Sequence, residues 1–339
     1  MGDGVIRRMR VLLLGASGLL GHNVLRRLLD EGHEVRVLVR RPDAVKLHGE
    51  WETVTGSLTD FATLLGVAED RDAIVNCAGV TDMSLRRGDY TAVNTTLCTS
   101  LLEVMKRLGI RTLVHASTVN TIGHGSAAHP ATGQEPMSAP FTESYYAESK
   151  RDGEQLLTEW ARLNPEWHIV VVNPGYMIGP MDVKPSSGRL LLLGYRKRVM
   201  FAPRGGKAFV DVRDVAAAMT SALTRGVNGE RYIAVNKCEC HTIKELYELQ
   251  ARVLGYRQRV LELPDGLLAV AGRVGDMLRA LGVRSEVSTR NVRQLMVREF
   301  YDSSHAISDL AMPQTPLEQS IRDFYQWRVE EGKSGKVEM

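Results

Sequence analysis

A tyrosine and a lysine four positions apart, Tyr146 and Lys150, form the pair best suited to acid–base chemistry. Residues four positions apart on a helix share one face, and apolar spacing predicts a helix over Tyr146–Leu163. An unperturbed tyrosine has a pKa of about 10, and a nearby cation lowers that pKa toward the useful range. The alternative is an exposed helix pair with no chemical role. Tyr145 has the wrong offset to Lys150, so we expect it to be a pocket or packing residue.

Two adjacent hydroxyl residues, Ser117 and Thr118, follow the apolar run Thr112–Ala116, which predicts a buried strand. Parallel sheets present their ligand-facing groups at the carboxyl ends of strands. A hydroxyl at that position can donate a hydrogen bond to a substrate carbonyl oxygen as charge develops on it. The alternative is a simple cap at the strand end.

Three glycines, Gly15, Gly18 and Gly21, lie between a predicted strand, Arg10–Leu14, and a predicted helix, Leu19–Glu31. Glycine permits the tight turn, leaves room for a pyrophosphate and lets the helix pack closely on the strand. The helix N-terminus then offers unpaired N–H groups to the phosphates. We therefore expect a dinucleotide site whose phosphate-binding residues are Gly15, Ser17, Gly18, Leu19 and Leu20.

The end of the second predicted strand, Glu34–Val39, indicates which dinucleotide is bound. Proteins that bind NAD place an acidic residue there to hold the ribose 2′-hydroxyl. Arg40 and Arg41 stand there instead, and an arginine fork suits a 2′-phosphate that a carboxylate would repel. The sequence therefore predicts NADP(H) rather than NAD(H). A solvated basic pair is the alternative.

The elements that must position these groups alternate along the first half of the chain. Strand-like runs separated by helical stretches predict an α/β fold with a doubly wound parallel sheet covered on both faces. We expect a dinucleotide-binding domain in residues 8–180 plus 209–236 and a smaller, mostly helical substrate domain in 181–208 plus 237–330. A tail is expected over 331–339. One helix is expected over Tyr90–Leu108 and another over Val210–Arg225 after a short strand.

Composition excludes several classes of protein. The 339 residues carry 43 basic and 40 acidic side chains, a net charge of +3 that gives no reason to expect a nucleic-acid partner. No apolar run approaches the roughly 20 residues of a membrane span. Four cysteines are too few for a disulfide framework, so we expect a cytoplasmic setting. Neither Cys238-Glu-Cys240 nor the histidines at 115, 124 and 129 have a second ligand cluster, so no metal is expected.

The order and spacing of these motifs resemble the extended branch of the short-chain dehydrogenase/reductase superfamily, which includes NAD(P)-dependent epimerases and dehydratases. The resemblance is carried by the glycine turn, residues 76–79 and 115–118, the Tyr146/Lys150 pair, and residues 173–180 and 210–217. It implies a Rossmann fold and a catalytic triad of Thr118, Tyr146 and Lys150. Ser117 is the alternative to Thr118 as the hydroxyl of this triad. It also implies cofactor contacts from Leu58, Cys77, Ala78, Gly79, Asn173, Pro174, Gly175 and Tyr176.

Two departures and one diffuse likeness refine this resemblance. Ser57 replaces the acid expected two residues after the third strand, so only Leu58 is left to pack on adenine. Val119 and Asn120 stand where sugar-nucleotide dehydratases carry an Asp-Glu pair for water elimination. The later half of the chain is similar to dihydroflavonol-reductase-like proteins.

Three functions follow as hypotheses. The first is an NADP(H)-dependent oxidoreductase that reduces a carbonyl group of a small-molecule substrate. The second is an NAD(P)-dependent nucleotide-sugar epimerase, and the third a non-catalytic nucleotide-sensing or scaffold protein, against which the intact triad argues. The family implies a homodimer paired through the helices of Tyr90 and Tyr146, while the residues leave the oligomeric state open.

Three surface features leave alternatives open. Residues 126–140 are either a cover over the site or a plain connection. The basic runs Arg196–Arg198 and Arg204–Lys207 either hold an anionic substrate group or are solvated. The amphipathic helix Leu267–Leu281 is expected to pack on the core, with contact to a membrane surface or a lipid substrate as its minor alternative, so no membrane contact is expected.

Overall fold

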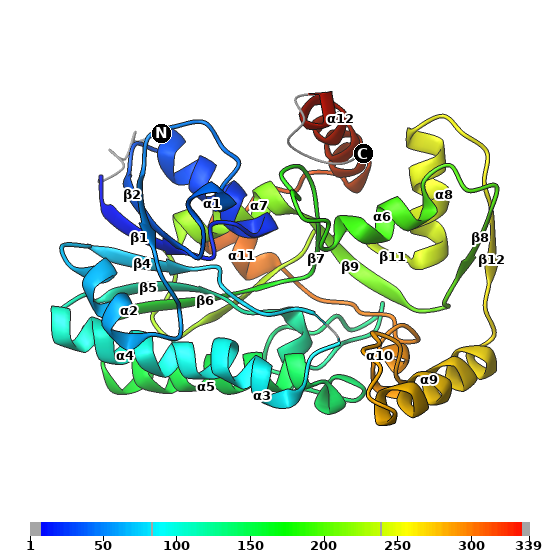
Figure 1. Ribbon diagram of the computed structural model, residues 1–339, viewed down its shortest axis with the longest axis horizontal. Helices are drawn as coiled ribbons and strands as arrows, with labels where there is room; N and C mark the ends of the chain where they lie inside the picture. Colours follow the sequence, from blue (N-terminus) through cyan, green and yellow to red (C-terminus); the bar gives the residue numbers. More distant parts are fainter. Residues whose placement is uncertain (1–7, 83, 238, 334–339) are drawn as a thin grey trace.

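A seven-stranded parallel sheet forms the centre of the computed structural model, which describes residues 8–82, 84–237 and 239–333 (Figure 1). Every neighbouring pair of strands in this sheet is parallel. The strand order is β10 (Arg231–Ala234), β6 (His168–Pro174), β5 (Thr112–Ala116), β4 (Ala73–Asn76), β1 (Arg10–Leu14), β2 (Glu34–Val39) and β3 (Glu52–Thr55). The predicted α/β fold class is therefore confirmed.

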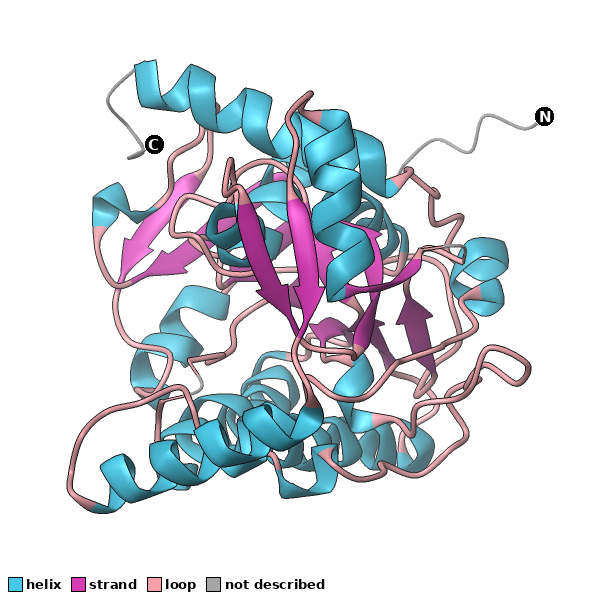
Figure 2. Cartoon of the chain, turned by 90° about the vertical axis from the view of Figure 1, so that its right-hand side faces the viewer, coloured by secondary structure: helices cyan, strands magenta, loops and turns pink. Residues whose placement is uncertain are grey.

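Helices cover both faces of this sheet and make three layers, which Figure 2 shows as strands between two helical layers. One face carries α1 (Leu19–Asp30), α7 (Val212–Ser221) and α11 (Ser304–Asp309), and the other carries α2 (Phe61–Ala68), α4 (Thr96–Leu108) and α5 (Tyr145–Leu163).

Strand β1 shows how the sequence produces this arrangement. All four residues after Arg10 are buried, and alternate side chains point to opposite faces of a sheet. Val11 and Leu13 accordingly join the cluster under α1 and α7, while Leu12 and Leu14 join the cluster under α2 and α4. A continuous apolar run is thus what a strand buried on both faces requires.

The second half of the chain builds a smaller region beside the carboxyl ends of the central strands. It contains a three-stranded sheet of β11 (Cys240–Thr242), β9 (Gly206–Asp211) and β7 (Tyr176–Ile178), and a two-stranded sheet of β12 (Arg259–Glu262) and β8 (Val199–Ala202). Its helices are α6 (Gly188–Gly194), α8 (Ile243–Val253), α9 (Asp265–Ala280), α10 (Thr289–Arg293) and α12 (Leu317–Lys333). Its own apolar cluster is centred on Phe209 and Phe324.

One helix from this late part of the chain returns to the first region. Ala306 of α11, with Leu310 and Met312 just after it, lies in the same apolar cluster as Val11 and Val215. Strand β10 is covered by this helix because Tyr232 belongs to that cluster too.

Four expectations need correction. The helix expected over Val210–Arg225 begins only at Val212 because Val210 and Asp211 pair with β7. Residues 331–333, expected to be tail, continue α12, and the rest of the expected tail lies outside the described residues. The segment 90–108, expected as one helix, divides into α3 (Arg87–Tyr90), a π-helical turn (Thr91–Thr95) and α4. The helix expected to pack its apolar residues on the core, α9, instead exposes them, and only Gly272 and Gly275 are buried.

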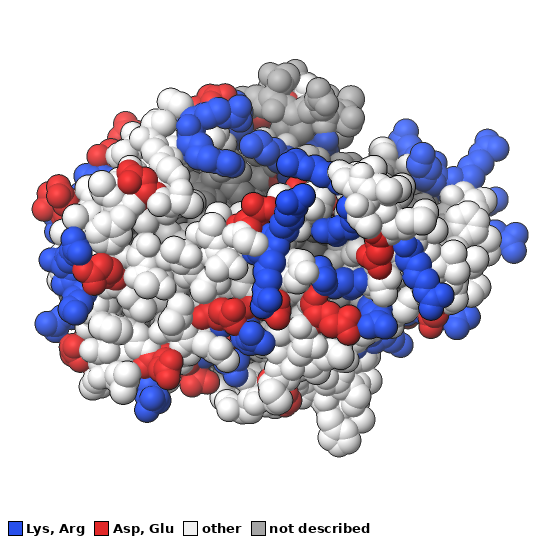
Figure 3. Space-filling view, turned by 60° about the horizontal axis from the view of Figure 1, so that its bottom comes forward, with Lys and Arg blue, Asp and Glu red and all other residues white. Residues whose placement is uncertain are grey.

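Charged side chains are unevenly distributed over the face drawn in Figure 3, where acidic and basic groups mix on the left and basic groups predominate at the right-hand end. Within the described ranges, no helix combines the length and apolarity that crossing a bilayer demands.

Candidate active site

The glycine turn lies at the carboxyl end of β1, where α1 begins. Gly15 has φ +80°, and a Cβ there would lie 2.5 Å from the backbone nitrogen of Ala78, so both the conformation and the space require glycine. A Cβ on Gly21 would lie 2.0 Å from the carbonyl oxygen of Gly15, so α1 sits directly against the turn. Gly18 is exposed, and a Cβ there would meet only the Gly15 oxygen at 3.5 Å. The turn is thus a cradle open toward the N-terminus of α1, and it fits a diphosphate.

The other residues expected at the cofactor follow neighbouring strands at the same edge of the sheet. Arg40 and Arg41 come directly after β2, and both are exposed. Arg41 has Asp43 at 3.9 Å, whereas Arg40 forms no ion pair with a described residue. Leu58, beyond β3, is half-buried against the apolar cluster under α2. These positions leave a basic surface next to the cradle, with Arg40 free of an acidic neighbour in an ion pair among the described residues.

Three small residues follow β4, the strand that lies between β1 and β5 in the sheet. Cys77, Ala78 and Gly79 follow β4, and burial raises the pKa of the Cys77 thiol to about 12, which keeps it protonated and unreactive. A Cβ on Gly79 would lie 3.6 Å from Nζ of Lys150. These residues therefore connect the glycine turn to the Lys150 side chain.

Tyr146 and Thr118 are brought together although they lie 28 positions apart in the sequence. Burial raises the pKa of Tyr146 to about 12, and a hydrogen bond with the Thr118 side chain opposes that rise. The expected lowering of this pKa by Lys150 is not found, because Lys150 is not among the groups that perturb it. A buried phenol with a raised pKa stays protonated at neutral pH and can act as a proton donor.

The Lys150 ammonium is buried behind this pair. Its side chain is 3% exposed, and Nζ donates a hydrogen bond of 2.6 Å to the carbonyl oxygen of Ala116, the last residue of β5. Burial lowers its pKa. One turn of α5 therefore fixes Tyr146 and Lys150 beside the end of β5, where Ser117 and Thr118 follow.

Ser117 and the residues after β6 occupy different surroundings. The Ser117 hydroxyl is buried and has no hydrogen-bond partner among the described residues, so Thr118, and not Ser117, contacts Tyr146. The Asn173 amide donates to the Thr118 carbonyl oxygen at 3.1 Å. A Cβ on Gly175 would lie 2.4 Å from the Ala208 carbonyl oxygen, so the backbone after Pro174 packs tightly on β9.

Tyr176, expected at the cofactor, contacts the smaller region. Its hydroxyl donates to the Ser187 carbonyl oxygen at 3.1 Å, and its ring lies edge-on to Phe209 at 5.5 Å.

The buried carboxylate of Glu154, which the sequence analysis did not single out, holds together the residues around the site. Glu154 lies one turn after Lys150 on α5 and is 1% exposed. Its Oε2 accepts hydrogen bonds from Thr121 at 3.0 Å and from Asn173 at 2.7 Å, and its Oε1 accepts one from Arg231 at 3.0 Å. Glu154 could have been recognised in the sequence as a charged residue at a position where the helical pattern expects a buried apolar side chain.

Asn94 is a second residue that was missed. It lies in the π-helical turn and is buried, and its amide donates to Oγ of Ser149 at 3.0 Å. Its Oδ1 accepts from the Val80 backbone at 3.0 Å. Asn94 therefore joins α5 to the loop after β4, and π-helical turns are frequent at functional sites.

The space beside the Tyr146 phenol is a small hollow between the two regions. Its lining residues are Leu85, Tyr90, Ser144, Tyr145, Tyr146, Arg279, Arg290 and Asn291. The Arg290 guanidinium stacks over the Tyr145 ring at 3.6 Å, so Tyr145 is a pocket residue as expected. A substrate would reach Tyr146 between α5 and the α9–α10 segment.

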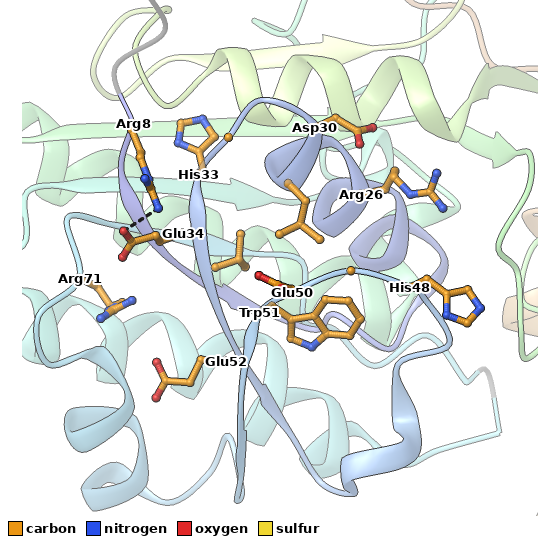
Figure 4. Close-up of a pocket in the computed structure, with 14 residues that line it drawn as sticks. Arg8, Arg26, Asp30, His33, Glu34, His48, Glu50, Trp51, Glu52 and Arg71 are labelled. Atoms are coloured by element: carbon orange, nitrogen blue, oxygen red, sulfur yellow. Dashed lines mark ion pairs between the residues drawn. The ribbon is translucent and has the colours of Figure 1, made fainter.

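A broader hollow lies at the opposite edge of the sheet. Figure 4 shows His33, Trp51 and Glu52 around it, at the amino ends of β2 and β3. Nothing that lines it belongs to the triad or to the glycine turn. It is therefore separate from the candidate active site.

Metal-binding groups do not gather anywhere in the described part of the chain: no cluster of three or more His, Cys, Asp or Glu side chains could hold an ion there. The His115 ring contacts the Asn76 amide at 3.1 Å, and the His124 ring contacts Oγ of Ser138 at 3.0 Å. Cys238 lies outside the described residues.

The family follows from a comparison with protein-family models. Residues 11–236 match the NAD dependent epimerase/dehydratase family. The chain belongs to this family. It is therefore an NAD(P)-dependent enzyme, and the glycine cradle after β1 is the part of its structure that fits the dinucleotide.

Similar proteins and solved structures match this chain over nearly its whole length. A putative dihydroflavonol 4-reductase of Synechocystis sp. is 29% identical, and the match spans 92% of each chain. Sterol demethylase protein B of Methylococcus capsulatus is 28% identical over 96% of this chain and 99% of its own. The crystal structure of gox2253 superposes with a TM-score of 0.80 at 24% identity, covering 97% of this chain and 99% of that one, which supports the fold.

Proposed function

We propose that the protein is an NADP(H)-dependent reductase of a small-molecule carbonyl group, with Thr118, Tyr146 and Lys150 at its centre. The observation that carries this proposal is the contact of the Tyr146 phenol with Thr118 beside the buried Lys150. The putative dihydroflavonol 4-reductase of Synechocystis sp. supports the reductase direction.

A nicotinamide, when bound, would supply the hydride for the carbonyl carbon. Tyr146 gives its proton to the carbonyl oxygen, and the raised pKa keeps that proton in place until it is needed. Thr118 orients the oxygen by hydrogen bonding. The Lys150 ammonium, fixed beside Tyr146 by its hydrogen bond to the Ala116 carbonyl oxygen, would hold a ribose hydroxyl of the cofactor.

The cofactor preference rests on the strand-end arginines. The glycine cradle and the N-terminus of α1 would hold the diphosphate, and Arg40 and Arg41 would hold a 2′-phosphate. The only acidic residue of β2, Glu34, lies at the opposite end of the strand, and none stands at its carboxyl end or in the two positions after it to compete for the ribose. The Asp43 carboxylate is nearest to Arg41, so Arg40 is the stronger candidate of the two.

The test is Tyr146→Phe, with Tyr145→Phe as the matched control on the same turn. General acid catalysis contributes about 10²- to 10⁴-fold, so Tyr146→Phe should lower NADPH consumption with a carbonyl substrate by that factor. The dissociation constant for NADPH, measured by fluorescence, should stay unchanged in both variants. Turnover retained in Tyr146→Phe would refute the role. Tightly bound cofactor with no net NADPH consumption would favour the nucleotide-sugar epimerase instead.

A further inference from the structure

The outward side of α9 is apolar, although it faces solvent. Exposed large apolar side chains concentrate in this part of the described chain, at Leu267, Val270, Val274, Met277, Leu278, Leu281, Val283, Val287 and Leu295. Their exposed fractions run from 37% at Leu278 to 74% at Leu281. Solvent-facing helices in globular proteins place polar residues on this side, so the pattern of α9 is inverted.

The packing of α9 explains which side points outward. A Cβ on Gly272 would lie 2.8 Å from Cα of Thr289, and one on Gly275 would lie 2.2 Å from the Val287 carbonyl oxygen. The glycine side of the helix is therefore pressed against the α10 segment. Residues 267, 270, 274, 277 and 281 follow at intervals of three and four, which places them on one stripe on the opposite side.

Basic side chains surround this apolar stripe. Arg273 lies on its flank and Arg284 just beyond its end, and both are exposed. Strands β8 and β12 lie at the same end of the molecule (Figure 1), and β12 leads into α9 through residues 263 and 264. Exposed basic residues there are Arg196, Lys197, Arg198, Arg257 and Arg259.

Apolar side chains are exposed among these basic residues as well. Val199 and Phe201, on one face of β8, are 50% and 55% exposed. Four acidic residues lie nearby: Asp265 and Asp276 on α9 itself, and Glu262 and Glu286, which pair with Arg204 and Arg189. None of the seven basic residues just named pairs with a described acid. The right-hand end of Figure 3 shows this surface as uncharged atoms bordered by Lys and Arg.

We propose that α9 and the β8–β12 edge form a peripheral docking surface for an anionic lipid bilayer. A helix with apolar residues on one side and Lys or Arg beside them lies in the membrane interface with its apolar side buried. Basic residues at its border are attracted to anionic headgroups. The sequence alone led us to expect no membrane contact, because the apolar residues of α9 were assigned to the core.

A second copy of the chain fits the surface less well. A coiled coil needs about three or four heptads, and the 16 residues of α9 provide about two. The apolar area is also wider than a two-residue seam, since Leu278, Val283 and Val287 extend it.

The surface adjoins the candidate active site. Arg279 of α9 lines the hollow beside Tyr146, and its guanidinium donates to the Leu85 carbonyl oxygen at 3.4 Å. Docking through α9 would therefore bring the mouth of that hollow to the bilayer surface. A carbonyl substrate dissolved in the membrane could enter without crossing bulk water.

The test is flotation of the full chain with vesicles of phosphatidylcholine alone or of equimolar phosphatidylcholine and phosphatidylglycerol. The paired substitution Val270→Glu and Val274→Glu removes two side chains at the centre of the stripe. Each should weaken partitioning about tenfold. Leu163→Glu with Val227→Glu, at exposed apolar positions elsewhere, is the matched control and should float like the wild type.

Charge is tested separately with Arg196→Gln, Lys197→Gln and Arg198→Gln together. We expect about a fivefold loss of binding to the anionic vesicles for each charge removed, and no change with neutral vesicles. Wild-type protein that does not float, or an α9 variant that floats equally well, would overturn the proposal. A dimer that the α9 variant dissociates, without vesicle binding, would assign the surface to a second copy. Flotation needs no turnover, so its outcome is independent of the proposed reductase activity.

Discussion

Replacing Glu154 by glutamine tests how the site is held in place. The carboxylate is 2% exposed in its side chain and pairs at 3.0 Å with Arg231, which is 29% exposed. Removing one partner of a buried ion pair costs about 3–5 kcal/mol, and the partial exposure of Arg231 places the expected loss near the lower bound, about 3 kcal/mol. The glutamine amide keeps an acceptor for Thr121 and Asn173 but turns a donor toward the guanidinium.

The matched control is Glu103→Gln, because Glu103 pairs with Arg107 at 2.6 Å on the surface, with exposed fractions of 43% and 54%. An exposed helix pair contributes little to stability because solvent screens it. Urea unfolding followed by circular dichroism at pH 7 measures both differences in free energy of unfolding. We also expect Glu154→Gln to lower kcat with little change in KM for NADPH, because Thr118 and α5 shift relative to each other. Equal destabilisation by the two substitutions would refute this reasoning.

Three further predictions concern the cofactor site and the smaller region. Gly15→Ala should destabilise the fold because Gly15 has a positive φ and an added Cβ would clash with the backbone. Gly18→Ala should fold normally and weaken only cofactor binding. Thermal unfolding measures the first effect and NADPH titration the second. Arg40→Ser should raise KM for NADPH about tenfold and leave KM for NADH unchanged, and equal changes in both would contradict the NADP(H) assignment. Although burial opposes it, hydrogen bonds from His241 and the Leu317 N–H hold the pKa of Glu239 below its ordinary value. The stability that the Glu239 carboxylate adds to the fold is then present above the unfolded pKa of about 4.3 and is lost as the pH falls through the folded pKa. Glu239→Gln should therefore be less stable than the wild type at neutral pH and should lose less stability in acid. Urea unfolding at several pH values measures both differences.

The central sheet could be predicted from the sequence because local signals decide it. Arg10–Leu14, Glu34–Val39 and Thr112–Ala116 are strands with the expected bounds, since short apolar runs next to glycine or asparagine have few other uses in a buried parallel sheet. The glycine turn and the Tyr146/Lys150 pair were recognisable for the same reason. Their spacing in the chain fixes their spacing in the structure.

Features that depend on distant neighbours could not be predicted in this way. Glu154 is a polar residue on a helix until Arg231 and Asn173 are brought to it from β10 and β6. The apolar stripe of α9 has the periodicity of a core helix, and only the packing of Gly272 and Gly275 on α10 shows that it faces outward. The pKa of Tyr146 likewise depends on burial, which a sequence motif does not contain.

The return of α11 to the first sheet has a consequence for biosynthesis. Every strand of that sheet leaves the ribosome before Ala306, yet Ala306, Leu310 and Met312 complete the apolar layer against β10. In a nascent chain paused after β10, the apolar surface beside Tyr232 is therefore still exposed to solvent, and a chaperone can bind there. Folding of the nucleotide-binding half concludes only near the end of translation.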